Sequence, residues 1–223
     1  LPHVHLSRGY AVPGEEFECE AQIEGMDALL PRLERRTDWL DGVFARLEGP
    51  SDAETRTIGV TGGVAAGKGL FARDLARMAN GRGRAATTVS LDLFRWRDRP
   101  VGPAQDPLGE AWALETLLGQ VLERHARGQA VAVDAPGGRV EVPADSLLIL
   151  EGPFLLHPRL RGALDRVVHL CAQPGTVRRR VAGRHAEPPA DGALALQRAF
   201  ELRFPPAQLA DLVLDATNAL GPA

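Results

Sequence analysis

Beyond about residue 56, short apolar runs alternate with longer segments of helical periodicity. Apolar runs without polar alternation are typical of parallel strands covered on both faces. Five segments have this pattern: Thr57–Thr61, Thr87–Leu91, Leu147–Leu150, Val167–Cys171 and Leu212–Leu214. Between them, Glu110–Arg127 has the clearest apolar helical stripe. This order predicts a three-layer α/β domain with its site at the carboxyl ends of the strands.

The first 50 residues have a different pattern. Met26–Leu47 is amphipathic and predicts a helix, and the helix-breaking cluster Gly49–Asp52 predicts a linker after it. We therefore expect an N-terminal extension over residues 1–50 and an α/β unit over residues 51–223. We interpret the helix as packed on that unit. A dimerisation or regulatory arm is the alternative, which leaves a homodimer open.

The composition excludes several classes of protein. Twenty-nine acidic against 26 basic residues give a formal charge of -3, which argues against a nucleic-acid partner. No apolar run approaches the ~18 residues of a membrane span, and no secretory signal pattern is present, so we expect no membrane partner and a cytoplasmic location. Cys19 and Cys171 lie far apart in the sequence and indicate neither a disulfide framework nor a zinc site.

The first predicted strand runs directly into a glycine-rich loop with the pattern G-x-x-x-x-G-K-G. Glycines let the backbone wrap a phosphate with its N–H groups inward, and the helix that follows adds its positive dipole end. Lys68 is the only lysine in the chain, and a compact ammonium fits between phosphates where a planar guanidinium does not. The residues expected to bind the nucleotide are Gly62, Gly63, Val64, Ala65, Ala66, Gly67, Lys68, Gly69 and Leu70.

Gly69 departs from the usual form of this motif, in which Ser or Thr provides a hydroxyl ligand for Mg²⁺. Backbone N–H groups can still cradle phosphate, but the metal must then rely on carboxylates, phosphate oxygens and water. Two interpretations follow. One is a kinase with altered metal coordination, and the other is a nucleotide-binding protein that has lost turnover.

Two carboxylates stand at the ends of predicted strands. Asp92 follows Thr87–Leu91, where it can accept the proton of an acceptor hydroxyl or hold a metal-bound water. A helix N-cap is the alternative for Asp92. Glu151 ends the strand Leu147–Leu150, where an acid needs a partner such as Mg²⁺. A buried ion pair is the alternative for Glu151.

Arginines and aromatic residues supply further candidates. Four arginines share a helical stretch after Val167–Cys171, where such a cluster can close over phosphates or form a solvated face: Arg178, Arg179, Arg180 and Arg184. Phe94 and Trp96 can stack on a flat acceptor. Asp106 can hold sugar hydroxyls or open the turn before Pro107.

Together these segments resemble the uridine kinase and phosphoribulokinase group of P-loop kinases, over most of residues 56–218. The segments that carry the resemblance are IGVTGGVAAGKG, LDLF, QDPLGEAW, VAVDAPGGRVEVPADS, LLILEG, RRRVAGRH and ADLVLDATN. The resemblance implies that Asp92 is the catalytic base, that Asp106 holds a ribose and that Glu151 helps to hold Mg²⁺. It also implies a β-ribbon before Glu151 and an arginine-bearing lid.

We therefore expect a kinase that uses ATP and Mg²⁺ to phosphorylate a hydroxyl of a small molecule, in the first place a nucleoside. Two alternatives remain, the same chemistry on pantothenate, a sugar phosphate or a secondary metabolite, and a non-catalytic nucleotide-binding regulator. The expected catalytic residues are Lys68, Asp92, Arg180 and Arg184. The expected acceptor-binding residues are Asp92, Phe94, Trp96 and Asp106, and Glu151 and Asp92 are the expected metal ligands.

Overall fold

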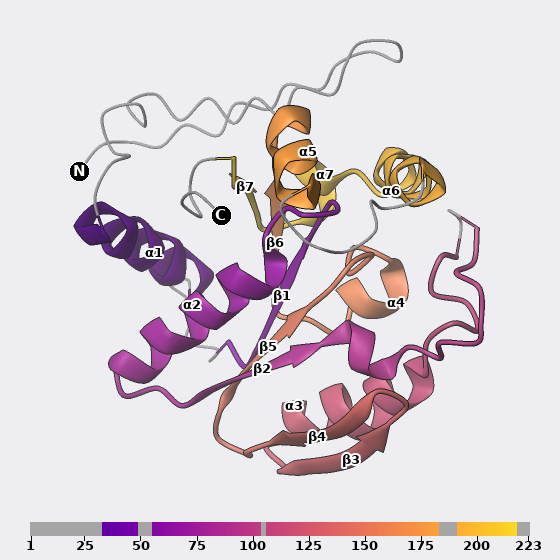
Figure 1. The fold of residues 1–223 in the computed structure, drawn as a ribbon. Helices are drawn as coiled ribbons and strands as arrows, with labels where there is room; N and C mark the ends of the chain where they lie inside the picture. The colour runs from indigo at the N-terminus through magenta and orange to yellow at the C-terminus, as the bar shows by residue number, and fades with distance from the viewer. Residues whose placement is uncertain (1–32, 49–54, 104–105, 183–190, 218–223) are drawn as a thin grey trace.

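The computed structural model describes residues 33–48, 55–103, 106–182 and 191–217 of the chain. Its centre is a five-stranded, wholly parallel sheet with the order β2-β5-β1-β6-β7 (Figure 1). The strands are β1 (Thr57–Gly62), β2 (Ala86–Ser90), β5 (Leu147–Glu151), β6 (Arg166–Cys171) and β7 (Leu212–Asp215). All five predicted strands are confirmed to within one residue at each end. β1, β5 and β6 are largely buried between helical layers, whereas in β2 only Val89 is buried.

Helices cover both faces of the sheet, which confirms the three-layer α/β fold. Leu148, Leu150 and Val167 face a core cluster that includes Phe200 of α6 (Asp191–Arg203) and Leu160 of α4 (Pro158–Arg161). The opposite face packs against α1 (Leu33–Glu48) and α2 (Lys68–Gly81). The helices α5 (Pro174–Ala182) and α7 (Pro206–Leu209) flank β6 and β7 (Figure 1).

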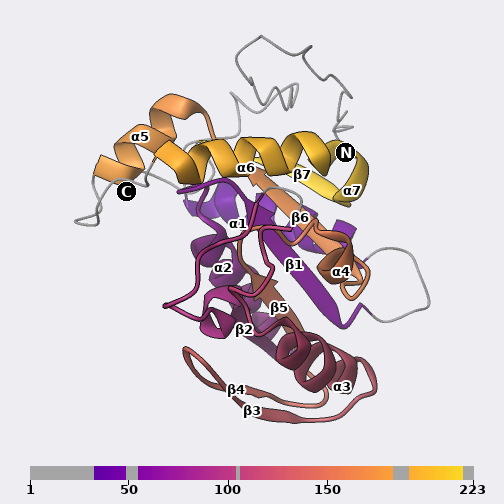
Figure 2. The same cartoon turned by 90° about the vertical axis from the view of Figure 1, so that its right-hand side faces the viewer.

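A separate antiparallel hairpin joins β3 (Val131–Ala135) to β4 (Gly138–Val142). Its apolar side chains belong to the same core cluster as α6, and Figure 2 shows the hairpin at the end of the molecule opposite α6. At the hairpin turn, Gly137 N donates a hydrogen bond of 2.6 Å to Leu93 O. A Cβ on Gly137 would approach the Leu93 backbone to 2.9 Å, so this contact requires glycine. The ribbon implied by the family resemblance is therefore present and touches the segment that follows β2.

The helix expected over Glu110–Arg127 begins later than predicted, at Leu114. Upstream, the backbone pairs with another segment, because Trp96 N donates to Ala111 O at 2.8 Å and Ala113 N donates to Phe94 O at 2.7 Å. From Leu114 the chain is helical, with a π-helical stretch (Thr116–Leu122) before α3 (Glu123–Ala126). The first residues of the predicted helix are thus extended and pair with the segment around Arg95. The periodicity of the sequence does not reveal this pairing.

The N-terminal helix α1 packs on α2. Phe44 and Leu47 are buried in the core cluster of that face, and the rings of Trp39 and Phe71 meet edge to face at 5.9 Å. Arg82 Nη2 of the segment after α2 lies 2.8 Å from Asp41 Oδ1. The predicted helix Met26–Leu47 overlaps α1, and its first part lies outside the described residues.

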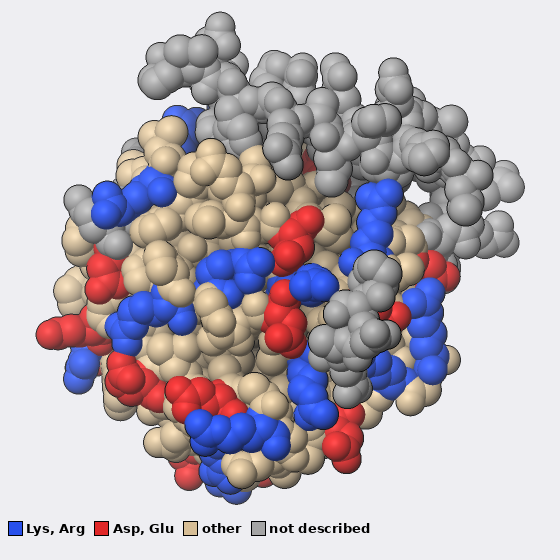
Figure 3. All heavy atoms as spheres, turned by 180° about the vertical axis from the view of Figure 1, so that it is seen from behind, with Lys and Arg blue, Asp and Glu red and all other residues tan. Residues whose placement is uncertain are grey.

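The surface carries acidic and basic side chains side by side. On the face in Figure 3, the two signs of charge are interspersed over the described residues. Ion pairs account for part of this mixing, for example Arg84–Glu48 and Arg139–Asp134. Among the described helices, none has the length and apolar character needed to cross a membrane.

Cys171 at the end of β6 is disulfide-bonded in the structure. This contradicts the expectation that the cysteines form no disulfide. The expectation rested on the distance along the chain between the two cysteines. Spacing therefore carries no information about this bond.

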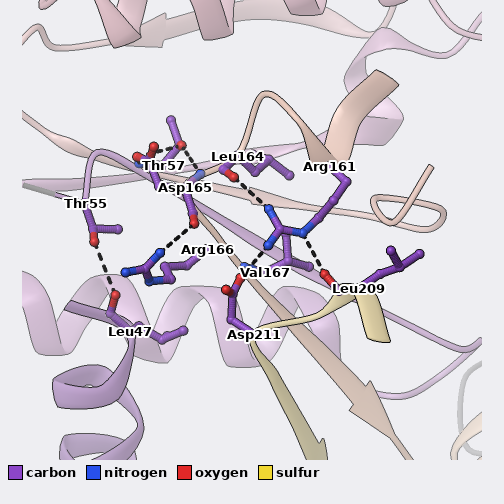
Figure 4. Close-up of polar contacts among 10 residues, drawn as sticks. All are labelled: Leu47, Thr55, Thr57, Arg161, Leu164, Asp165, Arg166, Val167, Leu209 and Asp211. Atoms are coloured by element: carbon purple, nitrogen blue, oxygen red, sulfur yellow. Dashed lines mark hydrogen bonds and ion pairs between the residues drawn. The ribbon is translucent and has the colours of Figure 1, made fainter. Parts of the chain in front are cut away.

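A polar cluster ties β1, β6 and β7 together at the amino end of the sheet (Figure 4). The carboxylate of Asp165 accepts hydrogen bonds of 2.8 Å from the backbone N–H groups of Arg56 and Thr57. The carboxylate of Asp211 accepts from Arg161 Nη2 at 3.0 Å and from Val167 N at 2.7 Å. β1 starts at this cluster and ends at the glycine-rich loop. The cluster and the loop therefore lie at opposite ends of the strands.

Replacing Asp165 with alanine is expected to lower the free energy of unfolding by about 1–3 kcal/mol, because two backbone N–H groups at the start of β1 lose their acceptor. Nucleotide binding by the folded variant should not change, since the loop is at the other end of β1. Urea unfolding followed by circular dichroism measures the first effect. Asp134→Ala is the matched control, because Asp134 is 82% exposed on the hairpin. A loss no larger than that of the control would contradict the structural role of Asp165.

Candidate active site

The glycine-rich loop begins where β1 ends, at the centre of the sheet. Gly62 has a φ of 147°, and a Cβ there would lie 2.2 Å from Leu170 O in the neighbouring strand. Gly67 has a φ of 92° and is the N-cap of α2, so it also needs the left-handed conformation that glycine adopts freely. β5 and β6 follow each other in the chain but lie on opposite sides of β1, so the order of the strands reverses beside β1. Ligands of open α/β sheets bind at the carboxyl ends of the strands at such a reversal.

The side chain of Lys68 lies against this loop. Its Nζ donates hydrogen bonds to Gly63 O at 2.9 Å and to Gly62 O at 3.2 Å. Lys68 is also the first residue of α2, whose initial backbone N–H groups have no acceptor within a helix. An ammonium group and a helix amino end therefore converge on the same loop, and both favour an anion.

Glu151 stands beside the position of the missing hydroxyl. In the sheet it pairs with Val60 of β1 and with Ser90 of β2. A Cβ built on Gly69 would lie 3.8 Å from the Glu151 carboxyl carbon and 3.8 Å from its Oε1. A carboxylate next to the loop is a ligand type that Mg²⁺ accepts, so these residues fit the metal of a Mg-nucleotide. Within the described residues there is no cluster of three or more metal-ligating side chains, so phosphate oxygens and water would complete the shell.

Gly69→Ser is expected to increase affinity for Mg²⁺, measured as a lower Mg²⁺ requirement for nucleotide binding or turnover. The space is available, because a Cβ at residue 69 meets Glu151 only at ordinary van der Waals distance. A serine hydroxyl there would add an oxygen ligand next to the carboxylate. Gly69→Ala is the matched control, since it adds the Cβ without the oxygen. Equal magnesium titrations for the serine and alanine variants would show that the site does not use a hydroxyl.

Asp92 lies in a short 3₁₀ helix, Leu91–Phe94, directly after β2. Ser90 is the N-cap of this helix, and its Oγ accepts from Asp92 N at 3.4 Å. Ser90, and not Asp92, is therefore the N-cap of this helix. The carboxylate of Asp92 is exposed. Because Ser90 pairs with Glu151, Asp92 stands at the same edge of the sheet as Glu151 and the loop.

Arg180 contacts the loop from α5. Its Nη1 donates to Ala65 O at 3.2 Å, and its Nη2 donates to Ala216 O at 2.8 Å, just after β7. The structure thus brings this predicted catalytic arginine to the nucleotide loop, where backbone carbonyls hold it. Arg179 donates to Thr176 Oγ1 within α5, and Arg184 lies outside the described residues. The catalytic roles of Arg180 and Arg184 stay predictions.

The predicted acceptor-binding residues differ in their surroundings. Phe94 is fully buried in the core, which matches packing better than stacking on a ligand. Trp96 is 38% exposed, and the guanidinium of Arg99 lies 5.1 Å above its ring. Asp106 Oδ1 accepts from Gly109 N at 2.9 Å and lies 3.8 Å from His157 Nε2. Asp106 therefore shapes its own turn, and its role toward a sugar stays a prediction.

Sequence reasoning missed an arginine on an aromatic platform near Asp92. The guanidinium of Arg95 lies 5.4 Å from the ring centroid of Trp112, which in turn meets the Phe154 ring edge to face at 6.3 Å. Trp112 Nε1 is buried and has no hydrogen-bond partner among the described residues, and Phe154 has a φ of 60°, a strained value for this residue type. Arg95 follows the LDLF motif directly, and this position was the one available signal.

Neither a known protein family nor a curated protein matches this sequence. Solved structures do resemble it. One is that of a possible uridine kinase from Bacillus stearothermophilus, with a TM-score of 0.56 and 16% identity, covering 80% of this chain and 98% of that one. Another is that of a candidate fructose transport system kinase from Silicibacter sp. TM1040, with a TM-score of 0.50 and 19% identity, again covering 80% of this chain and 98% of that one.

These similarities define the class of fold. The chain has the three-layer α/β architecture of the P-loop kinases that the two structures represent. At such identities the likeness establishes the fold alone. What the chain does must therefore be argued from its own site.

Proposed function

We propose that this protein is an ATP-dependent kinase that phosphorylates a hydroxyl group of a small molecule. The observation that supports it is the gathering of three different groups on adjacent strands. The loop with Lys68 follows β1, Glu151 ends β5, and Asp92 follows β2. A protein that only binds a nucleotide needs the first of these groups but has no use for an exposed carboxylate positioned beside it.

Each of these residues has a distinct role in the proposal. The loop amides and Lys68 bind the phosphates and offset their charge, which in phosphoryl transfer is most of catalysis. Asp92 accepts the proton of the attacking hydroxyl, for which its exposed carboxylate is suited. Arg180 fastens α5 to the loop through Ala65 O and so shapes the nucleotide side of the site.

The nucleotide and its metal fit the residues that are present. When bound, Mg-ATP supplies the transferable phosphoryl group and a metal charge on its oxygens. Glu151 and Asp92 are the carboxylates that would hold the metal. The chain's own part is to orient both substrates and to keep the acceptor hydroxyl next to Asp92.

Acceptor-dependent release of ADP from Mg-ATP tests this function. The panel contains nucleosides, pantothenate, sugars and sugar phosphates, with Lys68→Ala as the blank. ADP release that requires one acceptor class and is absent from the blank supports a kinase and identifies the class. ATP binding without release for any acceptor would favour the non-catalytic nucleotide-binding protein instead.

A nucleoside is the first candidate acceptor, and one observation favours an anionic acceptor as the second. Arg95 and Arg97 are exposed just after the Asp92 helix, and neither forms an ion pair with a described residue. The Trp112 ring holds the Arg95 guanidinium in place. An ordered, unpaired guanidinium beside the proposed base suits a phosphate or carboxylate on the acceptor.

Arg95→Ala distinguishes the two acceptor classes. If the acceptor is a sugar phosphate, this change should raise its KM about tenfold or more and leave the KM for ATP unchanged, because a charged contact is lost. If the acceptor is a neutral nucleoside, both constants should change little. Arg77→Ala on α2 is the control, since Arg77 is a surface arginine whose side chain is 75% exposed.

A further inference from the structure

A buried imidazole and a buried carboxylate lie behind the glycine-rich loop. His169 of β6 pairs with Thr61, the residue that precedes Gly62 in β1. Its Nε2 lies 3.5 Å from Oε1 of Glu201 in α6. His169 is 4% exposed, and the Glu201 side chain is 14% exposed. None of the roles proposed above uses either residue.

Few other charged groups face this pair. From α6, Gln197 Nε2 donates to Glu201 Oε1 at 2.7 Å, and the charge of Arg198 acts on Glu201. From the start of α2, the positive charge of Lys68 acts on both His169 and Glu201. From the strands on either side, the neighbours of His169 are the neutral Thr61 of β1 and Val213 of β7. Among the described residues, the phosphate-binding lysine is therefore the one charge that acts on both members of the pair.

The surroundings oppose charge on the pair. Burial, and secondly the charge of Lys68, lower the pKa of His169 to about 4, so its imidazole is neutral at neutral pH. The 3.5 Å contact is then not an ion pair. Burial also raises the pKa of Glu201. A carboxylate with increased proton affinity thus lies beside a neutral imidazole, close to the loop.

A bound nucleotide would change this balance through Lys68. In the free protein, the positive charge of Lys68 disfavours a proton on either residue. A triphosphate on the loop brings several negative charges, which offset the ammonium charge and favour protonation of groups nearby. By linkage, a ligand that promotes proton uptake binds more tightly as the pH falls.

We propose that His169 and Glu201 form a proton-binding site coupled to the phosphate loop, so that nucleotide binding takes up a proton. The inference rests on the proposed function only in requiring that the loop binds a nucleotide, and it needs no acceptor and no transfer. Affinity for ATP would then rise as the pH falls toward the raised pKa of Glu201.

Isothermal titration calorimetry of the full chain with ATP tests this coupling. Titrations at pH 6, 7 and 8, each in two buffers of different ionisation enthalpy, give the number of protons taken up. Glu201→Gln mimics the protonated acid. We expect it to bind ATP more tightly than the wild type does at pH 8, and to take up fewer protons. Glu123→Gln is the control for an exposed acid, and it also accounts for protons bound by the nucleotide itself.

The outcomes separate this inference from the proposed function. Equal proton uptake by the wild type and Glu201→Gln overturns the coupling and leaves nucleotide binding intact. Absence of ATP binding by the wild type overturns both. If Glu201→Gln does not fold, NMR titration of the wild-type His169 imidazole, assigned with His169→Gln, replaces it. An apparent pKa of His169 that rises on adding ATP supports the coupling, and an unchanged one overturns it.

Discussion

Lys68→Ala is expected to reduce turnover by about 10²–10³-fold or more, because the loop loses the one ammonium that can offset phosphate charge. Its Nζ is held against Gly62 O and Gly63 O, whereas Arg180 contacts the loop at Ala65 O. The measurement is acceptor-dependent release of ADP, with the affinity for ATP determined in parallel. We expect ATP binding to weaken as well, since the loop meets phosphates in the ground state and in the transition state.

Two variants make this prediction specific. Lys68→Arg keeps the charge but replaces a compact ammonium by a planar group, so it should also lose most activity. Arg73→Ala removes an exposed positive charge from the same helix and should have little effect. Activity of Lys68→Arg close to that of the wild type would show that charge alone matters at residue 68. A loss in Arg73→Ala as large as that in Lys68→Ala would point to a long-range charge effect.

Asp92→Asn is expected to lower kcat by about 10²–10⁴-fold while metal-free ATP binds as before, because asparagine cannot accept the proton of the hydroxyl. The shape of the side chain is kept, and the N-cap of its helix is Ser90, so the fold should not change. Steady-state kinetics with the acceptor, together with calorimetry for ATP, separates chemistry from binding.

Asp98→Asn is the matched control for this prediction. Asp98 is an exposed acid a short way along the same segment, and its replacement should leave kcat within about twofold. Full activity of Asp92→Asn would refute its assignment as the base. Weakened Mg-ATP binding with little change in kcat would instead assign Asp92 to the metal alone.

Much of the fold follows from local pattern. The five apolar strands were predictable because a parallel sheet covered on both faces leaves little room for polar positions. The start of the helix after Trp112 was not, since Ala111 and Ala113 form hydrogen bonds with a segment near Phe94. The helix boundary is set by hydrogen bonds to another segment of the chain. The periodicity of one segment carries no information about such bonds.

The site divides in the same way. The loop, Asp92 and Glu151 could be found because each directly follows an apolar strand. The nearness of the Glu151 carboxylate to the side-chain position of residue 69 depends on β1 and β5 lying side by side, and no spacing in the sequence expresses it. The meeting of His169 with Glu201 and the support of Arg95 by Trp112 are tertiary contacts of the same kind.

The order of the strands has a consequence for motion in the site. β1 is bonded on both sides, by β5 and β6, whereas β2 is an edge strand of the sheet. Central strands open with the last cooperative unit of a domain, and edge segments open locally at lower free energy. The amides of β1 should therefore exchange hydrogen only on global unfolding, and those around Asp92 much sooner. In the proposed kinase, the phosphate side of the site is thus built on an interior strand, and the acceptor side on an edge segment that can adapt around a substrate.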